Sequence, residues 1–306
     1  MKIAVTGATG KLGTVVTREL RASGHEVFAL DIVGSRGDGF TQVDFTDYGQ
    51  TVDALSGIDD RHKGLDAVVH LAAIPAGGIL TDSQTFHNNM AATFNVFQAA
   101  RRAGIRTIVY ASSETLLGIP FETPPPYLPV DENYESRPES MYSVTKHLEE
   151  ELARKLVRWD ARLSISALRF SNVMNPEDYA EFPSFDADAR IRNWNLWAYI
   201  DARDGAQAVL KALELSKPGF EAYIIANADT VMSRSSASLA AEVYPDVEVR
   251  RELGEHETLL SIDKARRMLG YEPAHTWRDQ MLTVCEPDVP PLCDPPGGFR
   301  DRHPVL

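Results

Sequence analysis

The sequence predicts an α/β protein with a doubly wound parallel sheet and a small C-terminal lobe. Over the first 170 residues, short apolar runs alternate with amphipathic ones, as strands alternate with crossover helices. The short runs are apolar throughout, which is typical of parallel strands covered on both faces. A glycine-rich segment joins the first short run to the first amphipathic one. With 306 residues, the chain is long enough for one large domain with a smaller lobe.

The hydrophobic pattern places the elements in order. Strands are expected at residues 3–5, 26–31, 41–44, 65–72, 105–112, 163–170 and 223–226. Helices are expected at residues 11–23, 84–103, 140–159, 202–216, 235–243 and 261–269. Leu148, Leu152 and Leu156 recur four apart and are expected to form the buried stripe of the third helix. Residues 176–195, rich in Asp, Asn, Pro and aromatics, are expected to form a loop.

The same pattern divides the chain into parts. We expect a dinucleotide-binding Rossmann domain at residues 1–172, to which residues 199–227 return. A substrate lobe is expected at residues 173–198 and 228–286, and a Pro-rich tail at residues 287–306. The segment 120–130 holds five prolines. It fits a lid over a site as well as it fits a rigid surface spacer.

The composition excludes several classes of function. Lys plus Arg number 31 against 44 Asp plus Glu, and a net charge of −13 repels nucleic acid and anionic membranes. Cys285 and Cys293 are too few for a disulfide scaffold, which favours a reducing compartment. We see no signal peptide, no apolar run that would span a membrane and no spacing typical of a metal site. A cytoplasmic protein without a metal, nucleic acid or membrane partner is expected.

Residues 6–13, Thr-Gly-Ala-Thr-Gly-Lys-Leu-Gly, follow the first expected strand and open the first helix. Gly7 permits a tight turn, Gly10 lets the backbone approach a pyrophosphate, and Gly13 lets helix and strand pack closely. The helix N-terminus then presents N–H groups to the phosphates. An ordinary strand-to-helix turn is the competing interpretation, but the position directly after the first strand favours a dinucleotide site.

Asp31 ends the second expected strand, 18 residues after Gly13. A carboxylate at this point accepts hydrogen bonds from the adenosine ribose and repels a 2′-phosphate. NAD is therefore the expected cofactor, in preference to NADP. Arg36 is near enough in sequence to hold a 2′-phosphate, but a solvated loop charge is the favoured interpretation.

Tyr142 and Lys146 lie four residues apart in the first turns of an expected helix, so they share one face. A nearby ammonium lowers the pKa of a phenol, and such a tyrosine takes a proton from a substrate hydroxyl near neutral pH. Ser112 and Ser113 follow the fifth strand, at the edge where doubly wound sheets bind ligands. Taken alone, the pair also fits a half-buried tyrosine beside a snorkelling lysine.

Taken in order, these segments resemble the extended short-chain dehydrogenases/reductases, of the NAD-dependent epimerase/dehydratase type. The resemblance covers residues 1–285. Its motifs are Thr6-Gly7-Ala8-Thr9-Gly10-Lys11-Leu12-Gly13, Asp44-Phe45, His70-Leu71-Ala72-Ala73, Asn89 with Thr93, Tyr142 with Lys146, Arg169-Phe170-Ser171-Asn172-Val173, and Tyr199-Ile200-Asp201-Ala202-Arg203-Asp204.

The resemblance implies roles for individual residues. Ser113, Tyr142 and Lys146 would be catalytic, with Lys146 also holding the nicotinamide ribose. The cofactor contacts would be Gly7, Thr9, Gly10, Lys11, Leu12, Gly13, Asp31, Asp44, Phe45, Leu71, Ala72, Ala73, Asn89 and Lys146. Two departures from the family pattern stand out: Leu117 occupies a place where tyrosine is frequent, and Ser113-Glu114-Thr115 occupies that of the dehydratase triad Thr-Asp-Glu. The second departure argues against sugar dehydration.

The substrate segment is short. Only 28 residues, 173–200, separate Asn172 from Asp201, which is little chain for a pocket that holds a second nucleotide. The arrangement is similar to that of uronate dehydrogenases, in which an arginine on this segment binds the substrate carboxylate. Arg192 is the candidate for that role, with a solvated loop arginine as the alternative. The expected substrate contacts are Ser112, Ser113, Asn172, Gly77, Gly78 and Arg192.

The expected function is therefore hydride transfer between NAD and a small carbohydrate-like alcohol or ketone. The alternatives are an NAD-dependent epimerase of sugars or nucleotide sugars and, less favoured, a cofactor-binding regulator without turnover. A homodimer is expected through the helices at 84–103 and 140–159, which the family pairs across a two-fold axis. The apolar side chains expected there are Phe94, Phe97, Leu148 and Leu152.

Overall fold

The computed structural model describes residues 1–35, 37, 39–57 and 61–284. Arg36, Cys285, Cys293 and the Pro-rich tail expected at 287–306 lie outside the described residues.

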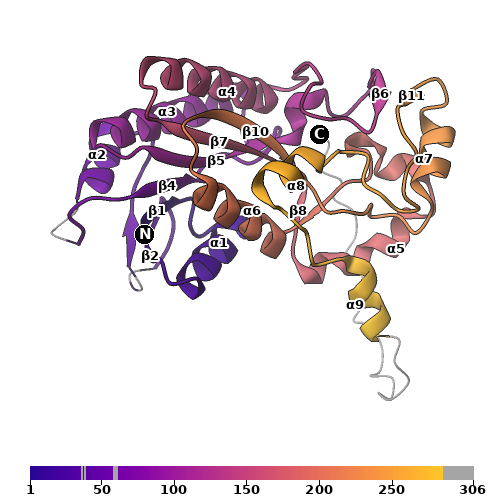
Figure 1. Ribbon diagram of the computed structural model, residues 1–306, viewed down its shortest axis with the longest axis horizontal. Coiled ribbons are helices and arrows are strands. Elements are labelled where there is room, and N and C mark those ends of the chain that lie inside the picture. Colours follow the sequence, from indigo (N-terminus) through magenta and orange to yellow (C-terminus); the bar gives the residue numbers. More distant parts are fainter. Residues whose placement is uncertain (36, 38, 58–60, 285–306) are drawn as a thin grey trace.

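A seven-stranded parallel sheet occupies the centre of the protein (Figure 1). Its strand order is β10-β7-β5-β4-β1-β2-β3. These strands are β1 (Lys2–Thr6), β2 (Glu26–Asp31), β3 (Phe40–Gln42), β4 (Ala67–His70), β5 (Thr107–Ser113), β7 (Ser164–Phe170) and β10 (Gly219–Ile225). The order reverses between β1 and β4, so the carboxyl ends of these two strands flank the crevice in which doubly wound sheets bind ligands. The predicted fold class is confirmed.

Helices cover both faces of the sheet (Figure 1). On one face, α3 (Asp82–Arg102) packs between α2 (Tyr48–Ser56) and α4 (Met141–Trp159). On the other face, α1 (Lys11–Ala22) packs against α6 (Ala202–Leu215). Each strand of the sheet is apolar because both of its faces are covered. In β1, Ala4 belongs to the apolar cluster under α3, and Ile3 and Val5 belong to the cluster on the opposite side.

The C-terminal half adds a lobe made of short elements. Its helices are α5 (Phe182–Phe185), α7 (Ser236–Val243), α8 (Asp263–Leu269) and α9 (Trp277–Val284), with 3-10 helices at Pro176–Glu181, Ala189–Ile191 and Asn193–Asn195. Two small sheets pair β6 (Tyr127–Leu128) with β11 (Glu248–Val249) and β8 (Val173–Met174) with β9 (Ile200–Asp201). A further 3-10 helix, Glu114–Leu117, follows β5.

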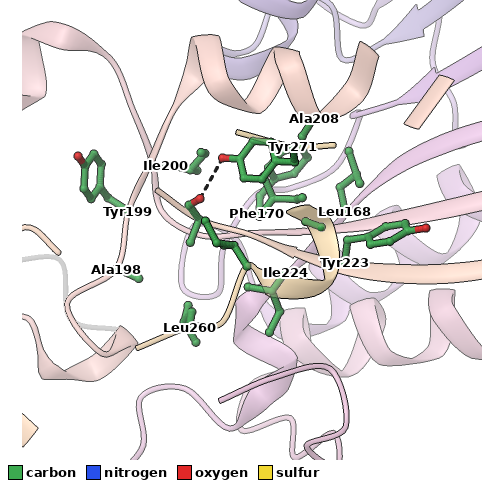
Figure 2. Packing of buried hydrophobic residues seen from close by; sticks show 14 of the residues in the cluster. Leu168, Phe170, Ala198, Tyr199, Ile200, Ala208, Tyr223, Ile224, Leu260 and Tyr271 are labelled. Atoms are coloured by element: carbon green, nitrogen blue, oxygen red, sulfur yellow. Dashed lines mark hydrogen bonds between the residues drawn. The ribbon is translucent and has the colours of Figure 1, made fainter. Parts of the chain in front are cut away.

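The lobe shares one apolar core with the sheet. Leu168 and Phe170 of β7 belong to the same cluster of buried residues as Tyr199, Leu260 and Tyr271 (Figure 2). The Tyr271 hydroxyl is fully buried and donates a hydrogen bond to the Ala226 carbonyl at 2.9 Å, shown as the dashed line in Figure 2. The side chains of the lobe are therefore packed directly onto the end of the sheet.

Several local predictions need correction. The segment 176–195, expected as a loop, contains the short helices given above, because its aromatic residues are buried: Tyr179 and Phe182 are 2% and 1% exposed. The helix α2 was missed, although Asp47 caps it by accepting a hydrogen bond from the Gln50 N–H at 3.0 Å. The Pro-rich segment 120–130 is anchored to the lobe by β6, which favours a rigid spacer over a lid.

The expected buried stripe of α4 is partly wrong. Leu156 is buried, but Leu148 and Leu152 are only half-buried at the edges of the inward face. That face instead carries polar residues, among them Tyr142, Ser143, Thr145, Lys146, Glu149 and Glu150. An apolar pattern could not reveal this, because each buried charge is compensated by a partner on another element or one turn along α4.

Candidate active site

The glycine loop has the geometry that a dinucleotide requires. Gly7 has φ +68°, and a Cβ there would lie 2.6 Å from the Ala72 nitrogen, so only glycine fits. A Cβ at Gly13 would lie 1.9 Å from the Gly7 oxygen, which explains the close packing of α1 on β1. A Cβ at Gly10 would lie 3.4 Å from the same oxygen and, apart from its chain neighbours, within 4 Å of no other described atom. The loop therefore has free space beside Gly10. The N–H groups of the first turn of α1 begin there, and these features fit a pyrophosphate.

Asp31 and Lys11 lie on either side of this loop. Asp31 Oδ2 accepts hydrogen bonds from the Thr9 N–H at 3.0 Å and from the Thr9 hydroxyl at 2.8 Å. Lys11 Nζ forms a 2.8 Å ion pair with Asp178 of the lobe and donates to the Val173 carbonyl at 3.3 Å. The next residue, Leu12, packs against α6, where a Cβ at position 205 would meet its Cδ1 at 2.9 Å. The loop is thus fixed to β2 and also to the lobe.

The segment after β4 lies across the crevice from the glycine loop and forms its second wall. The N–H groups of Leu71 and Ala72 each donate to the Thr6 hydroxyl at 3.2 Å, which holds residues 71–73 beside the glycine loop. The Asn89 side chain of α3 is fully buried and exchanges two hydrogen bonds with the Ile74 backbone, at 2.8 and 3.1 Å. Asn89 therefore shapes this wall from behind.

Two further predicted cofactor residues follow β3. Phe45 is buried, and its ring meets the His70 ring edge-on at 6.5 Å between centroids. Asp44 accepts hydrogen bonds from the N–H and hydroxyl of Thr46, at 2.9 and 2.7 Å, within its own turn.

Tyr142, Lys146 and Ser113 come together at the carboxyl edge of the sheet. Lys146 Nζ lies 5.7 Å from the centre of the Tyr142 ring, and both residues are buried. Burial raises the pKa of the Tyr142 phenol, while the Lys146 ammonium and a hydrogen bond with Ser113 act to lower it. A capping box between Ser140 and Ser143 fixes the first turn of α4, on which Tyr142 lies.

The structure separates the two adjacent serines. The Ser113 hydroxyl faces Tyr142 and accepts hydrogen bonds from the N–H and hydroxyl of Thr115, at 3.2 and 3.0 Å. The Ser112 hydroxyl donates to Glu150 Oε1 at 2.8 Å, in the interior below the site. Neighbouring side chains of a strand point to opposite faces, so only Ser113 is placed beside Tyr142.

The expected substrate residues lie around this group. A Cβ at Gly77 would lie 3.7 Å from that of Ser140, so the 75–80 loop packs over the start of α4. Gly78, next in that loop, has φ +76°. The Asn172 carbonyl accepts the Ile200 N–H at 3.0 Å, which joins the end of β7 to the substrate segment.

Arg192 is buried rather than solvated, with 7% of its surface exposed. Its guanidinium carbon lies 5.1 and 5.0 Å from the ring centres of Phe185 and Trp194, and Nη2 donates to the Ala198 carbonyl at 3.3 Å. Burial lowers the pKa of Arg192 to about 10, and the charge of Glu114 opposes the shift. No carboxylate among the described residues forms an ion pair with it within 4.0 Å. A buried arginine without such a partner is suited to an anionic ligand.

Glu114 is an ionisable residue that sequence reasoning left without a role. It follows Ser113, is 3% exposed, and accepts a hydrogen bond from the Asn195 amide at 3.1 Å. Burial raises the pKa of Glu114 to about 7, although hydrogen bonds from Ser171 and Asn195 and the charge of Arg192 oppose the rise. Its buried place beside Ser113 was not visible in the sequence, because it depends on the fold of residues 192–198.

No group of three or more His, Cys, Asp or Glu side chains in the described part of the chain could hold a metal ion. None of the helices within the described ranges is long and apolar enough to cross a membrane.

A dinucleotide loop followed by a paired tyrosine and lysine on a doubly wound sheet defines a short-chain dehydrogenase/reductase. The model of the NAD dependent epimerase/dehydratase family matches residues 3–226. The chain belongs to this family, whose members are of the extended short-chain type.

An epimerase and a dehydrogenase both align with nearly the whole chain. The chain is 25% identical to the UDP-glucose 4-epimerase of Bacillus subtilis, over 93% of this chain and 98% of that protein. It is 28% identical to the L-arabinose 1-dehydrogenase (NAD(P)(+)) of Haloferax volcanii, over 93% and 99%, respectively. A short-chain dehydrogenase/reductase superfamily protein from Agrobacterium tumefaciens, solved with bound NAD, aligns with a TM-score of 0.69 and 25% identity over 93% of this chain and 95% of that one.

NAD is the cofactor, as expected. The family is NAD-dependent, and the glycine loop described above has the open cradle that the pyrophosphate needs. When bound, NAD supplies the acceptor or donor of a hydride.

We predict a preference for NAD over NADP that depends on the charge of Asp31. The Asp31→Asn variant keeps an oxygen acceptor for Thr9 but loses the charge that repels a 2′-phosphate. The ratio of the dissociation constants for NADP and NAD, measured by calorimetry, should fall about tenfold or more, the scale of one charged hydrogen-bonding interaction. Equal affinity of the native protein for the two cofactors would contradict this assignment.

Proposed function

We propose that the protein is an NAD-dependent oxidoreductase that transfers a hydride between the nicotinamide and a small carbohydrate-like alcohol or ketone. The observation that carries the proposal is the grouping of Ser113, Tyr142 and Lys146 beside the glycine loop. A buried phenol with an ammonium and a hydroxyl beside it is equipped to move a proton to or from a substrate oxygen.

The three residues have separate roles in this proposal. Tyr142 takes the proton of the substrate hydroxyl during oxidation and returns it during reduction. Ser113 holds the same substrate oxygen and orients it toward the phenol. Lys146 favours the phenolate through its charge and holds the cofactor ribose. Because burial raises the pKa of Tyr142, alcohol oxidation should speed up as the pH rises and the phenol loses its proton.

Cofactor contacts in this proposal follow the two walls of the crevice. The glycine loop and α1 hold the pyrophosphate, Asp31 holds the adenosine ribose, and residues 71–73 lie along the nicotinamide half. The proposed contacts are Gly7, Thr9, Gly10, Lys11, Leu12, Gly13, Asp31, Asp44, Phe45, Leu71, Ala72, Ala73 and Lys146. Asn89, also expected to contact the cofactor, is fully buried behind residue 74 and supports this wall instead. Residues 1–172 with 199–227 form the proposed cofactor domain, and 173–198 with 228–286 the substrate lobe.

The proposed substrate is small because the substrate segment is short and tightly packed. Trp197 is fully buried, and its indole N–H donates to the Ala189 carbonyl at 2.7 Å, so core packing explains this residue. Asn172, Gly77 and Gly78 lie where the substrate would pass between the two parts of the protein. Ser112, bonded to Glu150, is assigned to the interior in this proposal rather than to the substrate.

An epimerase is the second candidate, and the match to the Bacillus subtilis enzyme over nearly its whole length favours it. Epimerisation uses the same three residues, so the site geometry does not distinguish the two. The short segment between β7 and α6 supports the dehydrogenase. A silent regulator is disfavoured because all three catalytic residues are present. We place the enzyme in the cytoplasm on the basis of its charge and low cysteine content.

One experiment tests the proposed function. The protein is mixed with NAD and a panel of aldoses, uronic acids and nucleotide sugars, and NADH is followed by its absorbance while products are resolved by chromatography. Net NADH formation with a free sugar or sugar acid supports the dehydrogenase. Inversion of a nucleotide sugar without net NADH selects the epimerase instead.

We expect the Tyr142→Phe variant to lose turnover about 10²- to 10⁴-fold, the usual contribution of a general base. NAD affinity should be preserved, because the glycine loop and Asp31 are unchanged. Turnover follows from the NADH assay and affinity from calorimetry. A variant with near-normal turnover would show that Tyr142 is not the base.

Arg192→Ala should weaken an acidic substrate about ten- to a hundredfold while leaving a neutral analogue nearly unchanged. The buried guanidinium would pair with a substrate carboxylate, and loss of such a partner costs roughly this much affinity. Measuring a uronic acid and the matching aldose on the same variant controls for damage to the fold. Equal losses for both substrates would remove Arg192 from the substrate site.

We further propose a homodimer formed through α3 and α4. Phe94 on α3 is 46% exposed, and Leu148 and Leu152 on α4 are half-buried, so all three can pack against a second copy. Phe97, also expected there, is fully buried against Tyr110 and cannot take part. Light scattering at micromolar concentration should give twice the mass of one chain for the native protein. The Phe94→Glu variant should give the mass of a single chain. A monomeric native protein would refute the proposal.

A further inference from the structure

Glu149 is a buried carboxylate that the proposed function does not use. It lies on α4 three residues after Lys146 and is 0% exposed. Its Oε2 is 3.0 Å from Lys146 Nζ, and the Lys146 side chain is only 4% exposed. A helix places residues three apart on the same face, so the two charges enter the interior together.

The Lys146 ammonium has three protons to donate. Glu149 takes one, and the Ala111 carbonyl of β5 takes another at 2.9 Å. Both acceptors are held rigidly, one by the sheet and the other by the helix. Only one N–H then remains for any other partner.

We infer that Glu149 is a positioning residue: with the Ala111 carbonyl it fixes the Lys146 ammonium in one orientation and retains its charge, so that the remaining N–H serves the cofactor ribose beside Tyr142. This inference rests on the proposed function. It assigns Glu149 no contact with substrate or cofactor; the residue acts through Lys146.

The charge of Lys146 needs this partner because the side chain is buried. Burial acts to lower the pKa of Lys146, but Glu149, with smaller contributions from Tyr142 and Glu150, reverses the effect, and the pKa is raised. The imidazole of His70 on β4 faces the same ammonium, and burial lowers its pKa to about 3, so it stays neutral and adds no charge. Without Glu149, burial would dominate and Lys146 would lose its proton at a lower pH.

Other charges near Lys146 are engaged elsewhere. Glu150 is bound by Arg169 of β7 through two hydrogen bonds, at 2.9 and 2.8 Å, and also accepts the Ser112 hydroxyl. The Tyr110 phenol of β5 is buried nearby, and burial together with Glu150 and Glu149 keeps its pKa well above the usual value, so it stays neutral. Glu149 is thus the anion placed to compensate Lys146.

Glu149 has its own support from α3. The Thr93 hydroxyl acts to lower the pKa of Glu149, which burial raises. The same hydroxyl lies 3.1 Å from His70 Nε2, and His70 Nδ1 lies 2.7 Å from the Thr6 hydroxyl. These two contacts link the end of β1, where the glycine loop begins, through His70 to Thr93 on α3.

The Glu149→Gln variant tests the inference, with NAD binding as the readout. Calorimetric titrations with NAD are made from pH 6.5 to 9.5 on the native protein, on Glu149→Gln and on Glu151→Gln. Glu151 is a matched control, because it lies two residues along the same helix and pairs with Arg154 and Lys155 at the half-exposed surface.

The native protein and Glu151→Gln should bind NAD with the same affinity throughout this range. Glu149→Gln should bind normally at pH 6.5, where Lys146 still carries a proton. Its affinity should fall about ten- to a hundredfold by pH 9.5, the loss expected for one hydrogen bond from a charged group. Thermal unfolding at pH 6.5 checks that the variant is folded.

Each other outcome has a definite meaning. A loss of affinity equal at every pH would show a purely structural role and overturn the inference, as would an unchanged, flat profile. If Glu149→Gln does not fold, Glu149→Asp replaces it: the shorter carboxylate should give a smaller fall at high pH, and a flat profile would overturn the inference. A native protein that binds no NAD at pH 6.5 would overturn the proposed function itself.

Discussion

The structure depends on how α4 compensates the charges that it carries into the interior. Lys146, Glu149 and Glu150 all lie on the face that packs against the sheet, and none of them is more than 3% exposed. An unpaired buried charge costs several kcal/mol, roughly the whole stability of a small domain. Each is therefore held: Lys146 by Glu149 and the β5 backbone, and Glu150 by Arg169. These pairings fix the height and rotation of α4 over the strands.

The site follows from that placement. Because α4 is held at β5 and β7, its first turn lies at their carboxyl ends, with Tyr142 beside Ser113. The order of strands in the sheet brings the glycine loop after β1 to the same edge, next to residues 71–73. The glycine loop and Tyr142 thus lie at the same edge of the sheet although more than a hundred residues separate them in the chain.

The parts that the sequence could predict are those with local signals. The strands were apolar runs, the glycine loop required its glycines for steric reasons, and Tyr142 with Lys146 had helical spacing. What it could not predict depends on long-range packing. Both Ser112 and Ser113 were expected to contact the substrate, but the alternation of β5 leaves only Ser113 facing Tyr142. For Arg192 the sequence left a carboxylate-binding role and a solvated loop arginine open, because its burial depends on how residues 176–198 fold. Glu149 had the right spacing from Lys146, yet the same spacing occurs on exposed helix faces.

The core shared between sheet and lobe limits how the enzyme can open. A hinge that swung the lobe away would bring Tyr199, Leu260 and Tyr271 into water, at about 1.5–3 kcal/mol for each large apolar side chain. Wholesale domain opening is therefore too costly to occur in every turnover. A movement of the 75–80 loop would cost far less, because Ile79 and Leu80, beside Gly78, are already exposed to water.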